Sequence, residues 1–342
     1  MRTFLALQIA CVCAATSAGQ TVDPPPQPGS GDAVTDFGFW SGSWLVQVVR
    51  KDLENAVYVD NGTARATVER VAGGDVLLER WEGETGASAD AFGLSLTYFD
   101  PAIERWVAVR SFPGGEPLAV QFGRIEGVFE EDMIPFHPPR VHQGGQFEIE
   151  RFHSTRSVFS DISSDEFRWF FQFPRLEYTW ETVRAMTHSR IGETPAGLSP
   201  LRIDRVPEAC ACEGDDPRLL DWLVGAWSGE GVSVRVSSVL RGCGVVADVR
   251  MERDGSPVSA VLAVAWDESS NTWQAREVGL NRPLGSLVWE AVGRVTAQGI
   301  ALRSMGVDDL GGMVFQRLEG GGMRLDMTLP DGRRLDAELE KL

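Results

Sequence analysis

The segments Phe39-Trp40-Ser41-Gly42-Ser43-Trp44 and Trp222-Leu223-Val224-Gly225-Ala226-Trp227 share the pattern aromatic-x-x-Gly-x-Trp, although they lie in different halves of the chain. Each is followed by an aromatic-Asp step and by a Trp six residues after the Asp. These second motifs are Phe99-Asp100 with Trp106, and Trp266-Asp267 with Trp273. Two motifs that recur in the same order indicate an internal duplication. We therefore expect two copies of one β-domain.

Short apolar runs separated by turn residues surround both motifs, and this pattern is typical of a sandwich or a barrel. In the first half, Asp75 to Glu82 follows Gly73-Gly74, and in the second half Asp254-Gly255 and Asp331-Gly332 are two-residue hairpin signals. Asp216-Pro217 has the form of a helix start. The sequence predicts an all-β fold of two tandem antiparallel β-barrels, each opened by a short helix.

The beginning of the chain has the features of a signal peptide. Met1-Arg2-Thr3 is followed by an apolar run from Phe4 to Ala15, which is too short to span a bilayer, and by small residues that suit cleavage. We expect export to the periplasm or the medium. The predicted segments are residues 1–18 as signal peptide, 19–32 as Pro-rich linker, 33–190 as first barrel, 191–214 as linker and 215–342 as second barrel.

The charge of the chain limits its partners. The formal net charge is −17, whereas a nucleic-acid-binding protein needs a basic surface. The same charge disfavours an anionic membrane surface, and no later segment is long and apolar enough for a membrane-spanning helix. Protein partners cannot be named from the sequence.

Three cysteines remain if Cys11 and Cys13 are removed with the signal peptide. Export permits a disulfide between Cys243 and either Cys210 or Cys212, and the odd number leaves one thiol over. Free thiols are the alternative. We expect no metal site, because one Cys-x-Cys and a second domain without His form a poor zinc ligand set.

One strand of the first domain carries a candidate ligand pocket. Alternation in Asp75 to Glu82 places Glu79 and Trp81 on one face, so an interior Trp81 would bring a carboxylate inside the barrel. Arg110 shares a face with Trp106 in its own strand and is a candidate partner for Glu79. The alternative is a solvated Glu79 at the rim. The Pro-rich segment 131–145 is expected to be a long loop, either a variable one or a ligand contact.

Beyond these patterns, Asp36 to Trp44, Tyr98-Phe99-Asp100-Pro101 with Trp106, Ser160-Asp161-Ile162 and Thr179-Trp180-Glu181 resemble a bacterial family of uncharacterised lipocalin-like domains. The opening of the second domain is similar to nitrobindin-type haem barrels, which belong to the same broad calycin class. The resemblance implies that Trp44 and Trp227 close the floor of each core. It also gives Gly42, Gly225, Asp100 and Asp267 a structural role.

The resemblance establishes no activity and leads us to expect no cofactor. Nitrobindin-type barrels bind haem through a His, but the second domain has none, and His153 and His188 of the first match no ligand motif. No Gly-x-Ser-x-Gly, His-Glu-x-x-His or phosphate-loop motif occurs.

Three functions therefore remain. The leading one, from fold-level analogy, is binding of a small, mostly apolar molecule in the first barrel. The second is a structural or protein-interaction role with both barrels filled. The third is an isomerase- or cyclase-type enzyme that uses Glu79 and Arg110.

Overall fold

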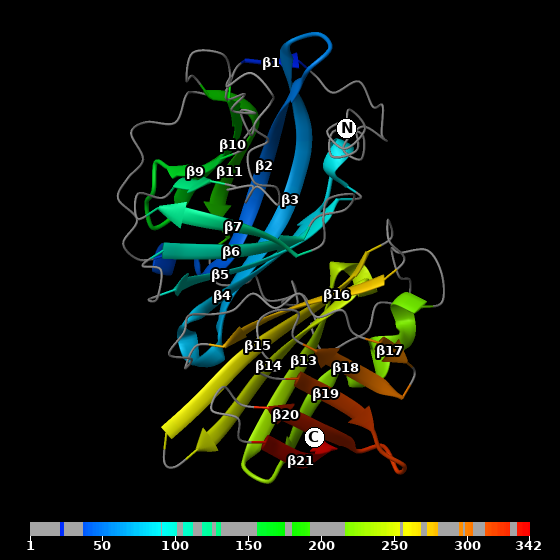
Figure 1. Ribbon diagram of the computed structural model, residues 1–342. Helices are drawn as coiled ribbons and strands as arrows, with labels where there is room; N and C mark the ends of the chain where they lie inside the picture. Colours follow the sequence, from blue (N-terminus) through cyan, green and yellow to red (C-terminus); the bar gives the residue numbers. More distant parts are fainter. Residues whose placement is uncertain are drawn as a thin grey trace, which may run out of the picture.

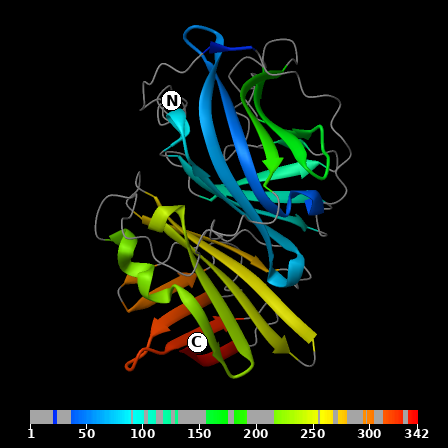
Figure 2. The ribbon, with the colours of Figure 1, turned by 180° about the vertical axis from the view of Figure 1, so that it is seen from behind.

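The computed structural model describes residues 21–23, 37–89, 91–100, 105–111, 118–124, 128–130, 156–174, 180–191, 216–253, 256–267, 272–279, 294–296, 298–303, 312–328 and 334–342. They form two curled antiparallel sheets, one from each half of the chain, which lie one above the other in Figure 1. The predicted fold class, two tandem antiparallel β-barrels with little helix, is confirmed. Figure 2 shows the same division from behind.

The first sheet closes on itself. Strand β3 pairs with β2 on one side and with β4 on the other, so the pairings from β2 to β11 return to their starting point. A single turn of 3-10 helix, η1 (Phe37–Trp40), precedes β2. The strands are β1 (Thr21–Val22), β2 (Gly42–Asp52), β3 (Val57–Val71), β4 (Val76–Gly83), β5 (Phe92–Asp100), β6 (Arg105–Ser111), β7 (Ala119–Arg124), β8 (Val128–Glu130), β9 (Arg156–Ser160), β10 (Glu166–Pro174) and β11 (Trp180–Arg190).

The second sheet has the order β16-β15-β14-β13-β12-β21-β20-β19-β18-β17. The helix before it, η5 (Asp216–Leu223), begins where Asp216-Pro217 predicted a helix start. The strands are β12 (Gly225–Gly229), β13 (Val232–Val239), β14 (Gly244–Arg253), β15 (Ser256–Asp267), β16 (Thr272–Gly279), β17 (Arg294–Thr296), β18 (Gly299–Arg303), β19 (Gly312–Arg317), β20 (Met323–Thr328) and β21 (Arg334–Lys341).

The repeated motif builds the same floor in both barrels. The indole Nε1 of Trp44 donates a hydrogen bond of 2.8 Å to the carbonyl oxygen of Trp40, and that of Trp227 donates one of 2.7 Å to the carbonyl oxygen of Leu223. Both tryptophans are buried. Each bond ties the first strand to the short helix before it, so the helix is held across one end of the barrel.

The glycine of the motif is required by backbone conformation in both copies. Gly42 has a φ of 136° and Gly225 a φ of 141°, values that residues with a side chain rarely adopt. A Cβ at Gly42 would collide with the guanidinium of Arg190, and one at Gly225 would collide with Lys341. These two cations belong to the last strand of each barrel, and each lies over the ring of the motif tryptophan.

The aromatic-Asp motif forms a hairpin in each barrel. Phe99 pairs with Trp106 across β5 and β6, and Trp266 pairs with Trp273 across β15 and β16. The ring centroids are 5.6 Å and 5.4 Å apart and both pairs are edge-to-face. The six-residue spacing between Asp and Trp therefore reflects a cross-strand aromatic pair.

The two barrels pack against each other through faces that point away from their own interiors. Alternation places Leu78, Leu96 and Val109 on the outward face of β4, β5 and β6, and Val261 and Ala263 on the outward face of β15. All five are buried and belong to one apolar cluster that spans both sheets. Strands β4 to β7 and β14 to β16 face each other where the sheets meet (Figure 1).

The contact between the barrels is reciprocal. The turn after β3, η2 (Ala72–Gly74), contacts β14 and β15, and the turn after β13, η6 (Leu240–Gly242), contacts β5. The amide of Ala72 donates to Oδ1 of Asp248 at 3.2 Å, and Nη2 of Arg241 donates to the carbonyl oxygen of Ala89 at 3.0 Å. Both turns start at a positive φ, 51° at Ala72 and 52° at Leu240.

Cys243 is buried in the second barrel and is disulfide-bonded. The candidate partners Cys210 and Cys212 lie outside the described residues, so the pairing stays a prediction. The predicted signal peptide and the Pro-rich loop 131–145 also lie outside them. Within the described part of the chain, no helix has the length and apolar character needed to cross a membrane.

Substitution of Leu96 by Ala should destabilise the protein by about 2–5 kcal/mol, the range for Leu→Ala in a buried core. We expect this although Leu96 lies on the outward face of its own barrel. The reason is that the second barrel covers this side chain completely. The control is Leu45→Ala, at an exposed position, which should change stability by less than about 0.5 kcal/mol. Denaturant unfolding measures both. Equal effects of the two substitutions would contradict the buried contact between the barrels.

Candidate functional site

The interior of the first barrel holds a belt of polar side chains above an aromatic floor. Strand pairing places Glu79 opposite Ser95, and Ser95 opposite Arg110, across β4, β5 and β6. Glu79 lies between Leu77 and Trp81 on its strand, and these two belong to the same interior cluster as Trp44. All three polar side chains therefore point into the barrel.

Arg110 is held by two strands further round the barrel. Its Nη1 donates a hydrogen bond of 3.1 Å to Oγ of Ser157 on β9, and its guanidinium lies over the ring of Trp169 on β10, 5.7 Å from the centroid. Arg110 and Ser157 are both buried. The arginine thus links β6 to β9 and β10 through the interior.

Glu79 forms no such hydrogen bond among the residues that the structure describes. It is half-buried, and burial raises the pKa of its carboxyl from 4.5 to about 7, although the nearby charge of Arg110 acts in the opposite direction. No hydrogen bond or ion pair within the described residues joins Glu79 to Arg110. Arg110 donates to Ser157, and it acts on Glu79 through its charge, so the pairing of the two residues considered from the sequence stays a prediction.

Near neutral pH, Glu79 is thus a mixture of carboxyl and carboxylate, and it can either donate or accept a hydrogen bond. The ring nitrogen of Trp81, two residues further along the same face, is buried and has no hydrogen-bond partner in the described structure. A carboxyl group and an indole N–H therefore face the interior with unused hydrogen-bonding capacity, next to a positioned guanidinium.

The other predicted pocket residue, Trp106, belongs to the floor. Its ring contacts Phe37 edge-to-face at 4.7 Å, and Phe37 in turn contacts Phe159 at 5.3 Å. The structure therefore brings Glu79, Trp81 and Arg110 to the walls and Trp106 to the base. The floor also includes Trp44. In the second barrel, Asp267 at the end of β15 accepts a hydrogen bond of 3.0 Å from the side-chain amide of Gln274.

His188, in the last strand of the first barrel, faces inward. Its side chain is packed into the aromatic floor. Its ring stacks on Phe167 with a centroid distance of 4.1 Å and meets Trp44 edge-to-face. Burial lowers the pKa of this imidazole to about 3, so the ring is neutral at physiological pH. No cluster of three or more potential metal ligands exists among the residues that the structure describes.

Sequence reasoning missed a second pair of charged residues in the same interior. Arg184 on β11 is the direct cross-strand partner of Arg50 on β2. Their strand neighbours on the same face, Met186 and Val48, belong to the interior cluster, so the two arginines also point inward. A signal was present, because Trp44, Val46, Val48 and Arg50 follow strict alternation.

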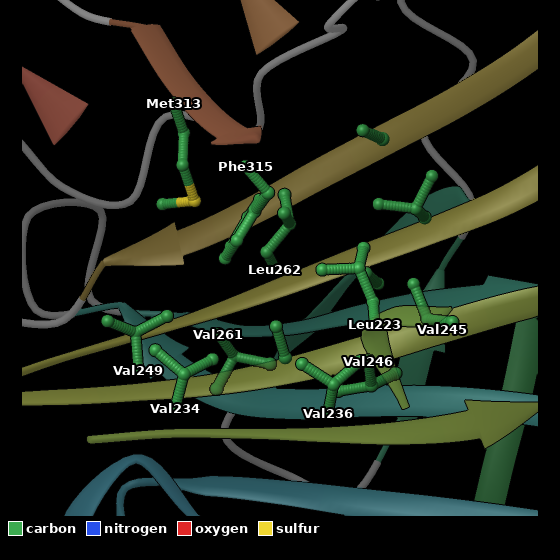
Figure 3. Close-up of a cluster of buried hydrophobic side chains, with 14 of the residues drawn as sticks. Leu223, Val234, Val236, Val245, Val246, Val249, Val261, Leu262, Met313 and Phe315 are labelled. Carbon is green, nitrogen blue, oxygen red and sulfur yellow. The ribbon is translucent and has the colours of Figure 1, made fainter. Parts of the chain in front are cut away.

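The second barrel has a different interior. Val234, Val249, Leu262, Met313 and Phe315 belong to one cluster of buried apolar side chains, and Figure 3 shows side chains from several strands gathered in it. Val232, Val234 and Val236 on β13 and Met323, Leu325 and Met327 on β20 are buried on its inward face, so these strands contribute an apolar core.

No family model and no curated protein matches the chain. Among solved structures, it is similar to a protein of unknown function from the DUF3598 family of Nostoc punctiforme, with 10% identity, 90% of this chain and 97% of that chain covered, and a TM-score of 0.24. The Aeromonas veronii immune modulator A is 8% identical over 100% of both chains, with a TM-score of 0.18. TM-scores this low establish no shared fold, so neither protein's properties are transferred to this chain.

Replacement of Glu79 by Gln should stabilise the protein increasingly as the pH rises from about 4.5 to 7. The pKa of Glu79 is about 7 in the folded protein and near the ordinary value of 4.5 in the unfolded chain. The wild-type protein therefore loses stability as the pH rises from 4.5 to 7, whereas the Gln variant has no proton to lose and keeps its stability. The gain at pH 8 should be about 1–3 kcal/mol. Thermal unfolding at pH 4.5 and pH 8 measures it. Glu54→Gln, in an exposed turn, is the control, and a gain that does not vary with pH would refute the shifted pKa.

Proposed function

We propose that the first barrel binds a small, mostly apolar molecule, and that Glu79 and Arg110 hold its polar group. The observation that carries the proposal is the placement of a half-buried carboxyl group with a pKa near 7 beside Arg110, above an aromatic floor. Burial of an ionisable group without a hydrogen-bonded partner costs stability, so the fold alone gives no reason for Glu79. A ligand that completes its hydrogen bonding gives one.

The surrounding side chains support a ligand with a planar or bulky apolar body. Trp169 and Phe171 are stacked with an interplanar angle of 8°, and Trp169 also supports Arg110. Trp81 contributes an N–H group that has no partner in the described structure. A molecule with an apolar body and one polar group that both donates and accepts hydrogen bonds matches this set.

Native mass spectrometry of the protein purified from the organism in which it occurs tests this proposal. We expect additional mass that is released on denaturation, and its value and absorption spectrum identify the chemical class of the ligand. Glu79→Gln and Arg110→Gln should weaken retention about tenfold or more, because each loses a charge-assisted hydrogen bond. Glu82→Gln, on the outward face of the same strand, is the matched control and should retain the ligand.

A bare polypeptide mass for the wild type, together with no binding of the neutral apolar dye N-phenyl-1-naphthylamine, would contradict the proposal. The protein would then be assigned to the alternative role, in which both barrels are filled and outward surfaces contact other proteins.

We also propose that the protein is exported, with residues 1–18 removed as a signal peptide and residues 33–190 and 215–342 forming the two domains. The intact mass and N-terminal sequence of the protein from its own host test this. A mature chain that begins at Gly19 is the expected result, and a chain that retains Met1 to Ala18 would exclude cleavage.

A further inference from the structure

The wall of the first barrel that carries its polar side chains is covered from outside by the second barrel. Glu79, Ser95 and Arg110 face inward on β4, β5 and β6. The outward faces of the same strands pack towards β14 to β16, and Leu96 and Val109 are completely buried there (Figure 1). The strands that position the proposed ligand site are therefore held between the interior of their own barrel and the other barrel.

Polar side chains of the second barrel also hold the chain segments that border this wall. Asp248 accepts a hydrogen bond from the turn before β4, and Arg241 donates one to the connection between β4 and β5. A third hydrogen bond reaches the beginning of β7. Here Nε of Arg276 on β16 donates to the carbonyl oxygen of Leu118 at 3.3 Å.

The bond from Arg276 lies next to the backbone of Arg110. Leu118 directly precedes Ala119, and Ala119 is the cross-strand partner of Arg110 in the last pair of the β6–β7 ladder. Arg276 and Leu118 are both buried. Leu118 has a φ of 56°, which residues with a side chain rarely adopt, and such a conformation persists only where the surroundings hold it. The donor from the second barrel is one such contact.

We propose that Arg276 is a positioning residue for Arg110, and that the second barrel is the frame of the ligand site in the first. By holding Leu118, Arg276 fixes the end of the ladder in which the backbone of Arg110 is paired. The contacts of Arg110 with Ser157 and Trp169 then hold its guanidinium inside the barrel. The importance of this arrangement for ligand binding rests on the proposed function.

The titration of Glu79 reports the position of Arg110. The charge of Arg110 lowers the pKa of Glu79 against the larger effect of burial, so a displaced Arg110 lets this pKa rise above its value of about 7. Carbon-13 NMR of the complete chain, labelled at the glutamate carboxyl carbons, measures the titration, and Glu79→Gln assigns the signal. We expect Arg276→Met to move the midpoint upward by about half a pH unit or more, because Met cannot donate to Leu118.

A double-mutant cycle separates positioning from a direct electrostatic effect. With Arg110→Gln already present, Arg276→Met should move the midpoint no further, whereas a direct effect of the Arg276 charge would persist. Arg276→Lys keeps an N–H donor and should restore the wild-type midpoint. Leu325→Ala, in the interior of the second barrel, should lower stability and leave the titration unchanged. Circular dichroism melting shows which variants are folded, and Arg276→Gln replaces Arg276→Met if the latter does not fold.

The outcomes separate this inference from the proposed function. An unchanged or lowered midpoint in the folded Arg276 variant, or an equal rise in the Arg110→Gln background, would overturn the positioning role. Binding of N-phenyl-1-naphthylamine to the wild type is scored independently. If the midpoint rises as expected and no dye binds, the positioning role stands and the ligand site falls. If the dye binds and the midpoint does not move, the ligand site stands and the positioning role is excluded.

Discussion

The packing of the two barrels through their outward faces is the contact on which the rest of the structure depends. Antiparallel sheets usually expose one face to water, but β4, β6 and β14 to β16 each carry buried apolar side chains on both faces. A barrel separated from its partner would expose Leu78, Leu96 and Val109, or Val261 and Ala263, to solvent. Apolar burial stabilises by about 25 cal/mol per Å², so each barrel supplies part of the other's core.

The two barrels share their architecture and differ in what they contain. Both have the same indole hydrogen bond, the same glycine at positive φ and a cation from the last strand over the motif tryptophan. The second barrel has a cluster of Val, Leu, Met and Phe inside it. The first has Glu79, Arg110, Arg50 and Arg184 among its inward residues. In the second barrel, β16 places Glu277 opposite the inward Leu262. Charged groups inside a barrel reduce stability, and the larger number of them that the described strands of the first barrel bring inward is the reason for assigning ligand binding to that copy.

The candidate site was predictable only in part from the sequence. Period-2 alternation was sufficient to place Glu79 and Trp81 on one face and to put Arg110 on the face of Trp106. It was not sufficient to assign the partner of Arg110, because Ser157 lies on β9, which does not neighbour β6 in the sheet. Arg50 and Arg184 are far apart in the sequence, and they meet because β2 pairs with β11.

The sequence by itself determined the duplication, the all-β class and the position of most strands, since these depend on local spacing, turn residues and alternation. The run Ala260-Val261-Leu262-Ala263-Val264-Ala265-Trp266 even shows that one strand is buried on both faces. Only the tertiary structure decided what covers the second face, which side chains meet inside the first barrel, and how far burial shifts the pKa of Glu79. These properties depend on contacts between residues distant in the chain and on the exclusion of water, and neither is encoded in the spacing of a single strand.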